Sequence, residues 1–265
     1  MPLSPLLARY PSVILDLDGC VWVGSQATPR AAEAIAALRA GGRRIAFITN
    51  DAQHAPEEYV RKLWSLGCTA SVEEVVSIGA TLQHVLAGRP PARTFVIGAP
   101  AIFRHVRDAG SRIVNGTAAA ESAELVVLAG HPGFDYTELR TAVRAVLGGA
   151  EILAGGRDAT FPGEGGPWPG DGAILAALEY ATGRTAVTVG KPEPQMFRTA
   201  LDRLGMDGAL VVGDRLDSDL RGAAGVGLDG AIVLTGVTSR AQAEDAIDPA
   251  PVAIAPDLGT LVLSS

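Results

Sequence analysis

The stretch Val13-Ile14-Leu15-Asp16-Leu17-Asp18-Gly19-Cys20 decides how the rest of the chain is interpreted. Its apolar start is typical of a strand buried in a sheet, and the glycine marks the turn after it. Asp16 and Asp18 lie at the end of this strand, where two carboxylates are not easily buried unless their charge is compensated. A divalent cation or a cationic substrate would compensate it, so the pair is a candidate site.

The composition suits an enzyme of modest size. The 265 residues suffice for one large domain or two smaller ones, and 48% hydrophobic with 19% charged residues suit a soluble α/β protein. The sequence has no apolar run of the roughly 20 residues that a membrane-spanning helix needs. The N-terminal sequence Met1-Pro2-Leu3-Ser4-Pro5 lacks the basic region of a signal peptide. We therefore expect a cytoplasmic protein with no membrane partner.

Charge and cysteine usage exclude further classes. A net charge of −7 disfavours a nucleic-acid partner, because phosphate backbones repel an acidic protein that carries no concentrated basic patch. Cys20 and Cys68 are too few for a disulfide framework, and neither has a neighbour at metal-ligand spacing. Both are expected to be reduced thiols.

Short runs rich in Val and Ile alternate along the chain with Ala- and Leu-rich segments of helical period. This alternation is typical of β-α-β units and a parallel sheet, so the predicted fold class is α/β. The expected strands are 13–17, 44–48, 75–78, 94–97, 125–128, 151–153, 186–189, 209–212 and 231–234. The expected helices are 29–40, 56–66, 80–86, 99–109, 136–147, 172–181, 194–204 and 217–226. The Gly- and Pro-rich stretch 155–171 is expected to be a long functional loop.

Polar side chains follow several of the expected strands. In open parallel sheets, ligands bind beyond the carboxyl ends of the strands, so residues placed there can converge. The residues so placed are Asp16, Asp18, Thr49, Lys191, Asp214 and Asp219. Acidic groups with a hydroxyl and an ammonium suit phosphoryl transfer, in which a cation neutralises the phosphoryl oxygens and donors hold them.

The ordered motifs resemble those of the haloacid dehalogenase superfamily. They read Asp16-Leu17-Asp18-Gly19, Thr49-Asn50, Gly190-Lys191-Pro192 and Gly213-Asp214-Arg215-Leu216-Asp217-Ser218-Asp219. The long interval between the second and third motifs has the position of the C2-type cap in the NagD-like phosphatases, and its segments 156–162 and 169–173 also look like that subfamily. The resemblance implies a Rossmann-like parallel-sheet core over 1–81 and 185–265, with an inserted α/β cap over 82–184.

The resemblance also implies roles for the acidic residues. Asp16 would be the nucleophile that forms an aspartyl-phosphate, and Asp18 would be the general acid and base. Mg²⁺ would be held by Asp16, by the backbone carbonyl of Asp18 and by Asp214, since this hard cation prefers oxygen ligands. Asp219 would not bind the metal directly but would hold a metal-bound water or Lys191 in place.

Phosphate binding and substrate choice are assigned in the same way. Thr49, the backbone amide of Asn50 and Lys191 would hold the phosphoryl group. In the cap, the residues expected to contact the leaving group and set substrate specificity are Arg157, Asp158 and Trp168. One segment departs from the family: Asp51-Ala52-Gln53-His54 stands where a second Asn and small hydroxyl residues are common, which weakens any transfer of substrate preference.

Each of these residues also has a simpler interpretation. Asp18-Gly19 could form only a turn, Thr49 could cap a helix, and Asp219 could stabilise a helix dipole. A dinucleotide-dependent oxidoreductase would suit the fold class, but no GxGxxG motif opens a helix after a strand.

The function expected is that of a Mg²⁺-dependent phosphatase acting on a small phosphorylated metabolite, such as a sugar phosphate, nucleotide or glycerol phosphate. The alternatives are a phosphomutase or phosphotransferase on the same scaffold, and a non-catalytic small-molecule-binding relative. A homodimer is compatible with the resemblance, because cap-mediated dimers occur among such proteins.

Overall fold

The computed structural model describes residues 2–163 and 165–264, and the chain divides into two compact units. Unit 1 takes its described residues from Met1–Thr49, Pro56–Val76 and Lys191–Ser265, and unit 2 from Asn50–Ala55 and Ser77–Gly190. The chain therefore leaves unit 1 and returns to it, so that residues distant in sequence share one sheet.

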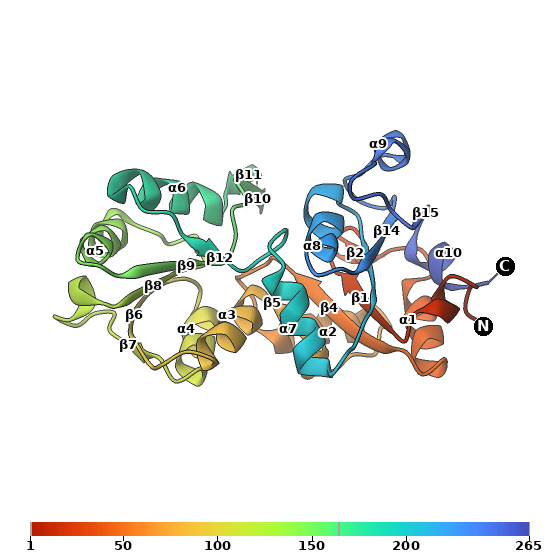
Figure 1. Cartoon of the computed structure of the whole chain (residues 1–265), viewed down its shortest axis with the longest axis horizontal. Helices are drawn as coiled ribbons and strands as arrows, with labels where there is room; N and C mark the ends of the chain where they lie inside the picture. The colour runs from red at the N-terminus through yellow and green to blue at the C-terminus, as the bar shows by residue number, and fades with distance from the viewer. Residues whose placement is uncertain (1, 164, 265) are drawn as a thin grey trace. The chain divides into compact units, whose positions relative to one another are not determined.

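Unit 1 is built on a six-stranded sheet in the order β15-β14-β13-β1-β4-β5 (Figure 1). The strands are β1 (Ser12–Asp16), β4 (Arg44–Thr49), β5 (Val75–Ser77), β13 (Leu210–Gly213), β14 (Asp229–Val233) and β15 (Ala253–Ala255). β1 runs parallel to both neighbours, with Val13 opposite Leu210 and Asp16 opposite Ile48. All five residues of β1 are buried, which explains its apolar sequence and places its carboxyl end in the middle of the sheet edge.

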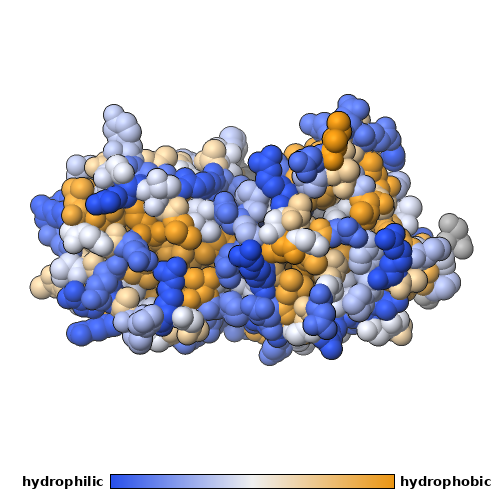
Figure 2. All heavy atoms as spheres, in the orientation of Figure 1, coloured by the Kyte–Doolittle hydropathy of each residue, from blue (hydrophilic) through white to orange (hydrophobic). Residues whose placement is uncertain are grey.

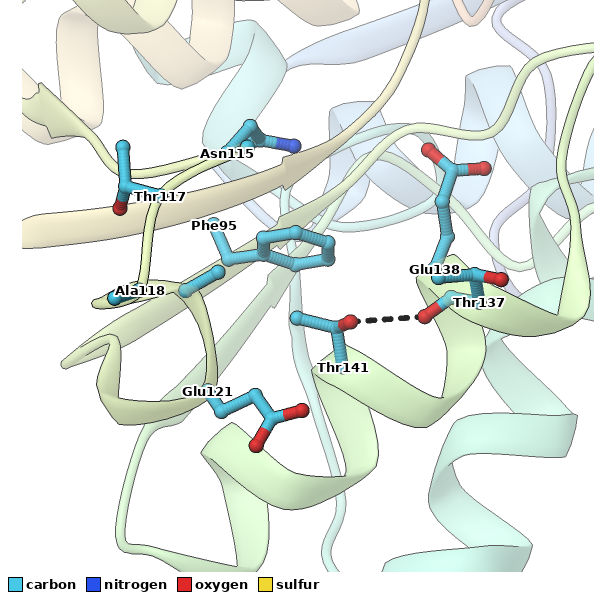
Figure 3. Close-up of a pocket in the computed structure, with 10 residues that line it drawn as sticks. Phe95, Asn115, Thr117, Ala118, Glu121, Thr137, Glu138 and Thr141 are labelled. Carbon is cyan, nitrogen blue, oxygen red and sulfur yellow. Dashed lines mark hydrogen bonds between the residues drawn. The ribbon is translucent and has the colours of Figure 1, made fainter.

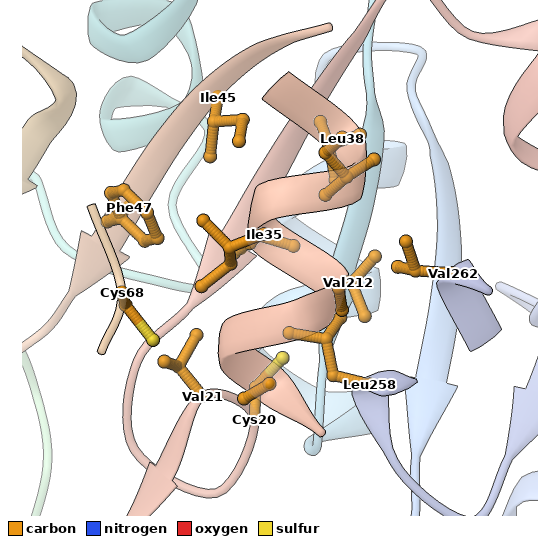
Figure 4. Close-up of a cluster of buried hydrophobic side chains, with 14 of the residues drawn as sticks. Cys20, Val21, Ile35, Leu38, Ile45, Phe47, Cys68, Val212, Leu258 and Val262 are labelled. Atoms are coloured by element: carbon orange, nitrogen blue, oxygen red, sulfur yellow. The ribbon is translucent and has the colours of Figure 1, made fainter. Parts of the chain in front are cut away.

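Helices cover both faces of this sheet. They are α1 (Ala31–Ala40), α2 (Pro56–Ser65), α7 (Gln195–Leu204), α8 (Arg221–Ala224), α9 (Arg240–Asp245) and α10 (Leu258–Val262), with short turns η1 (Leu7–Arg9), η2 (Val72–Glu74) and η4 (Leu216–Leu220). On one face, Ile35 and Leu38 of α1 pack with Leu258 and Val262 of α10 (Figure 4). Cys20 and Cys68 are buried free cysteines in the same cluster.

The end of β13 differs from the expected single helix over 217–226. A five-residue π-helix, η4, comes first and the short α8 follows it. In this wider turn the backbone N–H groups of Asp219 and Leu220 both donate to the Arg215 carbonyl, at 3.0 and 3.3 Å. Single-turn π-helices are frequent at functional sites, and this one carries Asp219.

Unit 2 has a five-stranded sheet in the order β12-β9-β8-β6-β7, and all neighbouring strands run parallel. The strands are β6 (Arg93–Ile97), β7 (Arg112–Ile113), β8 (Leu125–Leu128), β9 (Glu151–Ala154) and β12 (Val187–Thr188). The helices are α3 (Ile78–Ala87), α4 (Pro100–Asp108), α5 (Tyr136–Leu147) and α6 (Asp171–Thr182), with the turn η3 (Ala120–Ser122). α5 and α6 lie on one side of the sheet, and α3 and α4 on the other (Figure 1).

The stretch 155–171 is not one long irregular loop, so this expectation was wrong. It contains an antiparallel hairpin of β10 (Thr160–Gly163) and β11 (Gly166–Pro169), in which Phe161 faces Trp168 with ring centroids 6.3 Å apart. Glycine and proline are depleted in strands, so the composition of this stretch did not predict a strand pair. Contact between aromatic side chains on the two strands stabilises it.

None of the helices in the described part of the chain combines the length and hydrophobicity needed to cross a bilayer. On the face shown in Figure 2, hydrophilic residues are interspersed with apolar ones on both units.

Candidate active site

Three buried carboxylates gather at one edge of the sheet in unit 1. Asp16 is the last residue of β1, Asp214 directly follows β13, and Asp219 lies in η4. One oxygen of each lies within 4.8 Å of the others, and the residues are only 5%, 2% and 0% exposed. Carboxylates held so close together and away from water require a compensating positive charge.

Lys191 supplies part of that charge. Its Nζ donates to Oδ1 of Asp16 and, at 2.8 Å, to Oδ1 of Asp219, and the residue is only 7% exposed. Burial works against the charged form of Lys191, but Asp16 and Asp219 outweigh it and raise the pKa of the ammonium. One ammonium faces three carboxylates, so negative charge remains in excess.

The excess changes the proton affinity of the acids. Burial raises the pKa of the Asp16 carboxyl well above its ordinary range, Lys191 lowers it, and repulsion from Asp219 raises it further. Burial also raises the pKa of Asp214. Without a further cation, Asp16 and Asp214 therefore hold protons more tightly than free carboxyl groups do.

Asp214 has one oxygen available for such a cation. Its Oδ2 accepts a hydrogen bond of 2.7 Å from the backbone N–H of Val237, whereas Oδ1 is buried and has no hydrogen-bond partner among the described residues. Buried polar atoms are normally paired, and clustered carboxylate oxygens are the ligands that a hard divalent cation prefers. The donor set therefore fits Mg²⁺.

Glycines allow the backbone to approach Asp214 closely. Gly19 has φ +87°, and a Cβ there would lie 2.5 Å from Cγ of Asp214. At Gly236 a Cβ would collide with the same carboxylate. The Thr235 hydroxyl donates to the carbonyl of Gly19 and ties the two segments together. Side chains at either glycine would displace Asp214.

Asp18 and Thr49 lie at the same sheet edge. Asp18 is exposed where Asp16 is buried, and its Oδ1 accepts a hydrogen bond of 2.7 Å from the indole N–H of Trp22. Thr49 is the last residue of β4, beside β1, and is 2% exposed. The structure therefore places all six polar residues expected at strand ends on unit 1, and four of them in one cluster.

The remaining expected residues belong to unit 2. The side chain of Asn50 donates to Oδ2 of Asp158 at 3.2 Å. The Arg157 guanidinium forms two hydrogen bonds with the carboxylate of Glu179, at 3.0 and 2.8 Å. Trp168 is 41% exposed on the hairpin. Arg157 and Asn50 thus make contacts within unit 2 itself.

Sequence reasoning missed two parts of the site. The loop Thr235-Gly236-Val237 follows β14, so the same rule about strand ends could have found it. The contact of Trp22 with Asp18 is the other part, and no sequence signal indicated that the indole N–H would bind this carboxylate. In the segment 51–54, which departs from the family pattern, the Asp51 carboxylate accepts a hydrogen bond of 2.7 Å from the backbone N–H of Gln53. It also pairs with the His54 ring at 2.6 Å.

A cavity of about 530 Å³ lies in unit 2 (Figure 3), whereas the carboxylate cluster belongs to unit 1. Its polar lining is largely used within the fold: the Asn115 amide makes two bonds to the backbone of Val96, and the Thr141 hydroxyl donates to the Thr137 carbonyl. It presents no clustered catalytic groups comparable to those of unit 1.

Fold and site together define an α/β enzyme whose acidic groups converge beyond the carboxyl ends of a parallel sheet. The chain belongs to the haloacid dehalogenase-like hydrolases: that family's model matches residues 13–112, and a HAD-hydrolase-like model matches residues 188–261.

Known relatives agree with this assignment. D-glycerol 3-phosphate phosphatase of Mycobacterium tuberculosis is 36% identical over 94% of this chain and 69% of its own. The 5'-nucleotidase YutF of Bacillus subtilis is 30% identical over 90% of this chain and 93% of its own. Among solved structures, glycerol phosphate phosphatase from M. tuberculosis in complex with magnesium matches with a TM-score of 0.88 at 34% identity, over all of this chain and 80% of that one.

Proposed function

We propose that this protein is a Mg²⁺-dependent phosphatase that hydrolyses a small phosphomonoester through an aspartyl-phosphate. The observation that carries the proposal is the excess of buried carboxylates over Lys191, together with the unpaired Oδ1 of Asp214. The relatives named above are phosphatases, and one of them was crystallised with magnesium.

The cation would be held by side-chain oxygens of Asp16 and Asp214 and by the backbone carbonyl of Asp18, with Asp219 holding Lys191 in place. When bound, Mg²⁺ neutralises the phosphoryl oxygens and so lets an anionic nucleophile approach.

The chain's own residues then divide the reaction. A carboxylate oxygen of Asp16 attacks phosphorus as the bond to the leaving oxygen breaks, and Asp18 gives its proton to that oxygen. In the second half-reaction Asp18 takes a proton from water, whose oxygen attacks the phosphorus of the aspartyl-phosphate and releases phosphate and free Asp16. Thr49 and Lys191 hold the phosphoryl oxygens throughout.

The leaving group is proposed to be a small alcohol, as in a glycerol phosphate, sugar phosphate or nucleotide. The relatives' names span these classes. Asp158 and Trp168 are proposed to contact it, with Arg157 fixing their segment through Glu179. A screen of phosphate release across these compounds and pyridoxal phosphate would identify the preferred substrate.

The central experiment uses p-nitrophenyl phosphate as substrate. Asp16→Asn is expected to lower turnover by about a thousandfold or more while the circular dichroism spectrum is unchanged, because the nucleophile is lost. Asp217→Asn is the matched control, since Asp217 lies in η4 with Asp219 but is exposed and paired with Arg215. EDTA should abolish activity and Mg²⁺ restore it; turnover that persists in EDTA would overturn the metal's role.

We also propose a cytoplasmic location and a homodimeric state. Cell fractionation tests the first. Sedimentation equilibrium tests the second, and a single species at the chain mass of 27.2 kDa would contradict it.

A further inference from the structure

Trp22 is almost completely buried, at 1% exposure, yet its one polar atom is directed at a site residue. Its indole N–H donates to Oδ1 of Asp18 at 2.7 Å. Trp22 lies in β2 (Trp22–Val23), which pairs with β3 (Gln26–Ala27) in a small hairpin. A large aromatic side chain therefore contacts the core with its body and Asp18 with its polar edge.

The backbone around Trp22 holds the ring in a defined position. The N–H groups of Val21 and Trp22 both donate to the Leu17 carbonyl, at 2.9 and 3.1 Å, and Gly19 donates to the Trp22 carbonyl at 2.7 Å. The Thr28 hydroxyl closes the hairpin by donating to the Cys20 carbonyl at 2.7 Å. Asp18 and Trp22 are thus joined by backbone and side chain alike.

Lys62 lies over the face of the Trp22 ring. Its Nζ is 3.9 Å from the centre of the Trp22 ring, within the range of a cation–π interaction. A cation on the ring face draws electron density from the indole and makes its N–H a stronger donor, since linked polar interactions polarise one another. Lys62 comes from α2, so a second element supports the contact.

We propose that Trp22, polarised by Lys62, positions the Asp18 carboxyl for proton transfer; this rests on the proposed acid–base role of Asp18. An indole N–H only donates, so Oδ1 of Asp18 must remain an acceptor. The transferred proton is therefore carried on Oδ2, which gives it to the leaving oxygen and later receives one from the attacking water. Trp22 is a positioning residue and touches no reacting atom.

The test compares two substrates of similar shape and different leaving groups. The leaving group of phenyl phosphate is a basic phenolate, which needs the proton of Asp18. The leaving group of p-nitrophenyl phosphate is the less basic p-nitrophenolate, which leaves without a proton. Trp22→Phe keeps the aromatic ring and removes the donor. We expect its rate of bond cleavage in the first turnover to fall about tenfold or more for phenyl phosphate and to stay within about twofold for p-nitrophenyl phosphate, with the substrate concentration that gives half the maximal first-turnover rate unchanged.

The second half-reaction gives an independent readout. With p-nitrophenyl phosphate, Trp22→Phe should show a burst of p-nitrophenolate followed by slow turnover, because Asp18 must still activate water. Trp64→Phe is the matched control: Trp64 is 61% exposed and its N–H binds the Ala70 carbonyl. It should leave both substrates unaffected.

Variants of Lys62 separate positioning from packing. Lys62→Met should lower the cleavage rate selectively for phenyl phosphate, by a smaller factor than Trp22→Phe does. Lys62→Arg, which keeps the cation, should retain the wild-type ratio of the two cleavage rates. Should Trp22→Phe fail to fold, the Lys62 pair decides the question alone. Equal losses on both substrates, or no loss, would overturn the proposal.

Asp18→Asn distinguishes this result from a failure of the proposed function. If that variant cleaves phenyl phosphate normally, then Asp18 is not the acid and the function itself needs revision. If Asp18→Asn is inactive while Trp22→Phe and Lys62→Met are normal, only the positioning role is wrong.

Discussion

Gly19 illustrates how a residue without a side chain shapes the site. It adopts φ +87°, and a Cβ would lie 2.5 Å from Cγ of Asp214. Gly24 also has a positive φ, +59°, but a Cβ there meets nothing within 4 Å. The two glycines therefore share the backbone requirement and differ in the contact with Asp214.

We predict that Gly19→Ala removes activity, whereas Gly24→Ala leaves it intact. Each substitution should cost about 1–2 kcal/mol of unfolding free energy, since a left-handed conformation disfavours alanine. Only the first should also displace Asp214 and thereby lower kcat by about a hundredfold or more. Urea unfolding and steady-state kinetics on p-nitrophenyl phosphate measure the two effects, and equal kinetics for both variants would contradict the assigned role of the Gly19–Asp214 contact.

At the scale of elements, periodicity predicted the strands that build the site. β1, β4 and β13 are apolar runs of regular length, and the polar residues after them were therefore identified from sequence. Elements that depend on tertiary contacts escaped prediction: β15 is a short edge strand, and the β10–β11 hairpin is rich in Gly and Pro. The π-turn at Asp219 also escaped, because hydrogen-bond register is not encoded in hydrophobic spacing.

The roles of side chains in unit 2 were the hardest to predict, because the sequence does not show which group a charged residue binds. Arg157 was expected to contact substrate, and no sequence signal indicated that its guanidinium would form two hydrogen bonds with Glu179 of α6. We predict that Arg157→Met lowers the unfolding free energy by about 1 kcal/mol or less, as for a partly exposed ion pair, with KM unchanged. A several-fold rise in KM for the preferred substrate would instead show that Arg157 binds it.

The start of α6 carries a pH dependence. Burial, and then repulsion from Asp158 and Asp51, raises the pKa of Asp171 from 3.8 to about 7. Between these two values the folded state binds more protons than the unfolded state, so the free energy of unfolding falls as pH rises through this window. We predict that Asp171→Asn flattens the decline of Tm between pH 5 and 8, without abolishing it, because the pKa of Asp16 is raised as well. Parallel curves for wild type and variant would contradict the prediction.

At the scale of the whole molecule, fold topology explains why the site carries excess charge. β1 lies at the centre of its sheet, and the chain passes through all of unit 2 before Lys191 returns to meet Asp16. Asp214 and Asp219 arrive later still, from β13 and η4. Folding of unit 1 therefore brings three carboxylates together with one ammonium, and this repulsion opposes folding until a cation binds.

Thermal unfolding should report this coupling directly. A ligand that binds only the folded state stabilises it by about 2.7 kcal/mol at a concentration of 100 Kd, so saturating Mg²⁺ should raise Tm by roughly 5–10 °C. Asp214→Asn should keep or raise the Tm measured in EDTA, because it removes one buried charge, and should lose most of the rise with Mg²⁺. Asp217→Asn should retain the full rise in Tm, because the Asp217 carboxylate is exposed and pairs with Arg215. NaCl at equal ionic strength separates cation binding from general screening. If Asp214→Asn responded to Mg²⁺ as the wild type does, the cation would not bind at this cluster, and the excess charge would need another explanation.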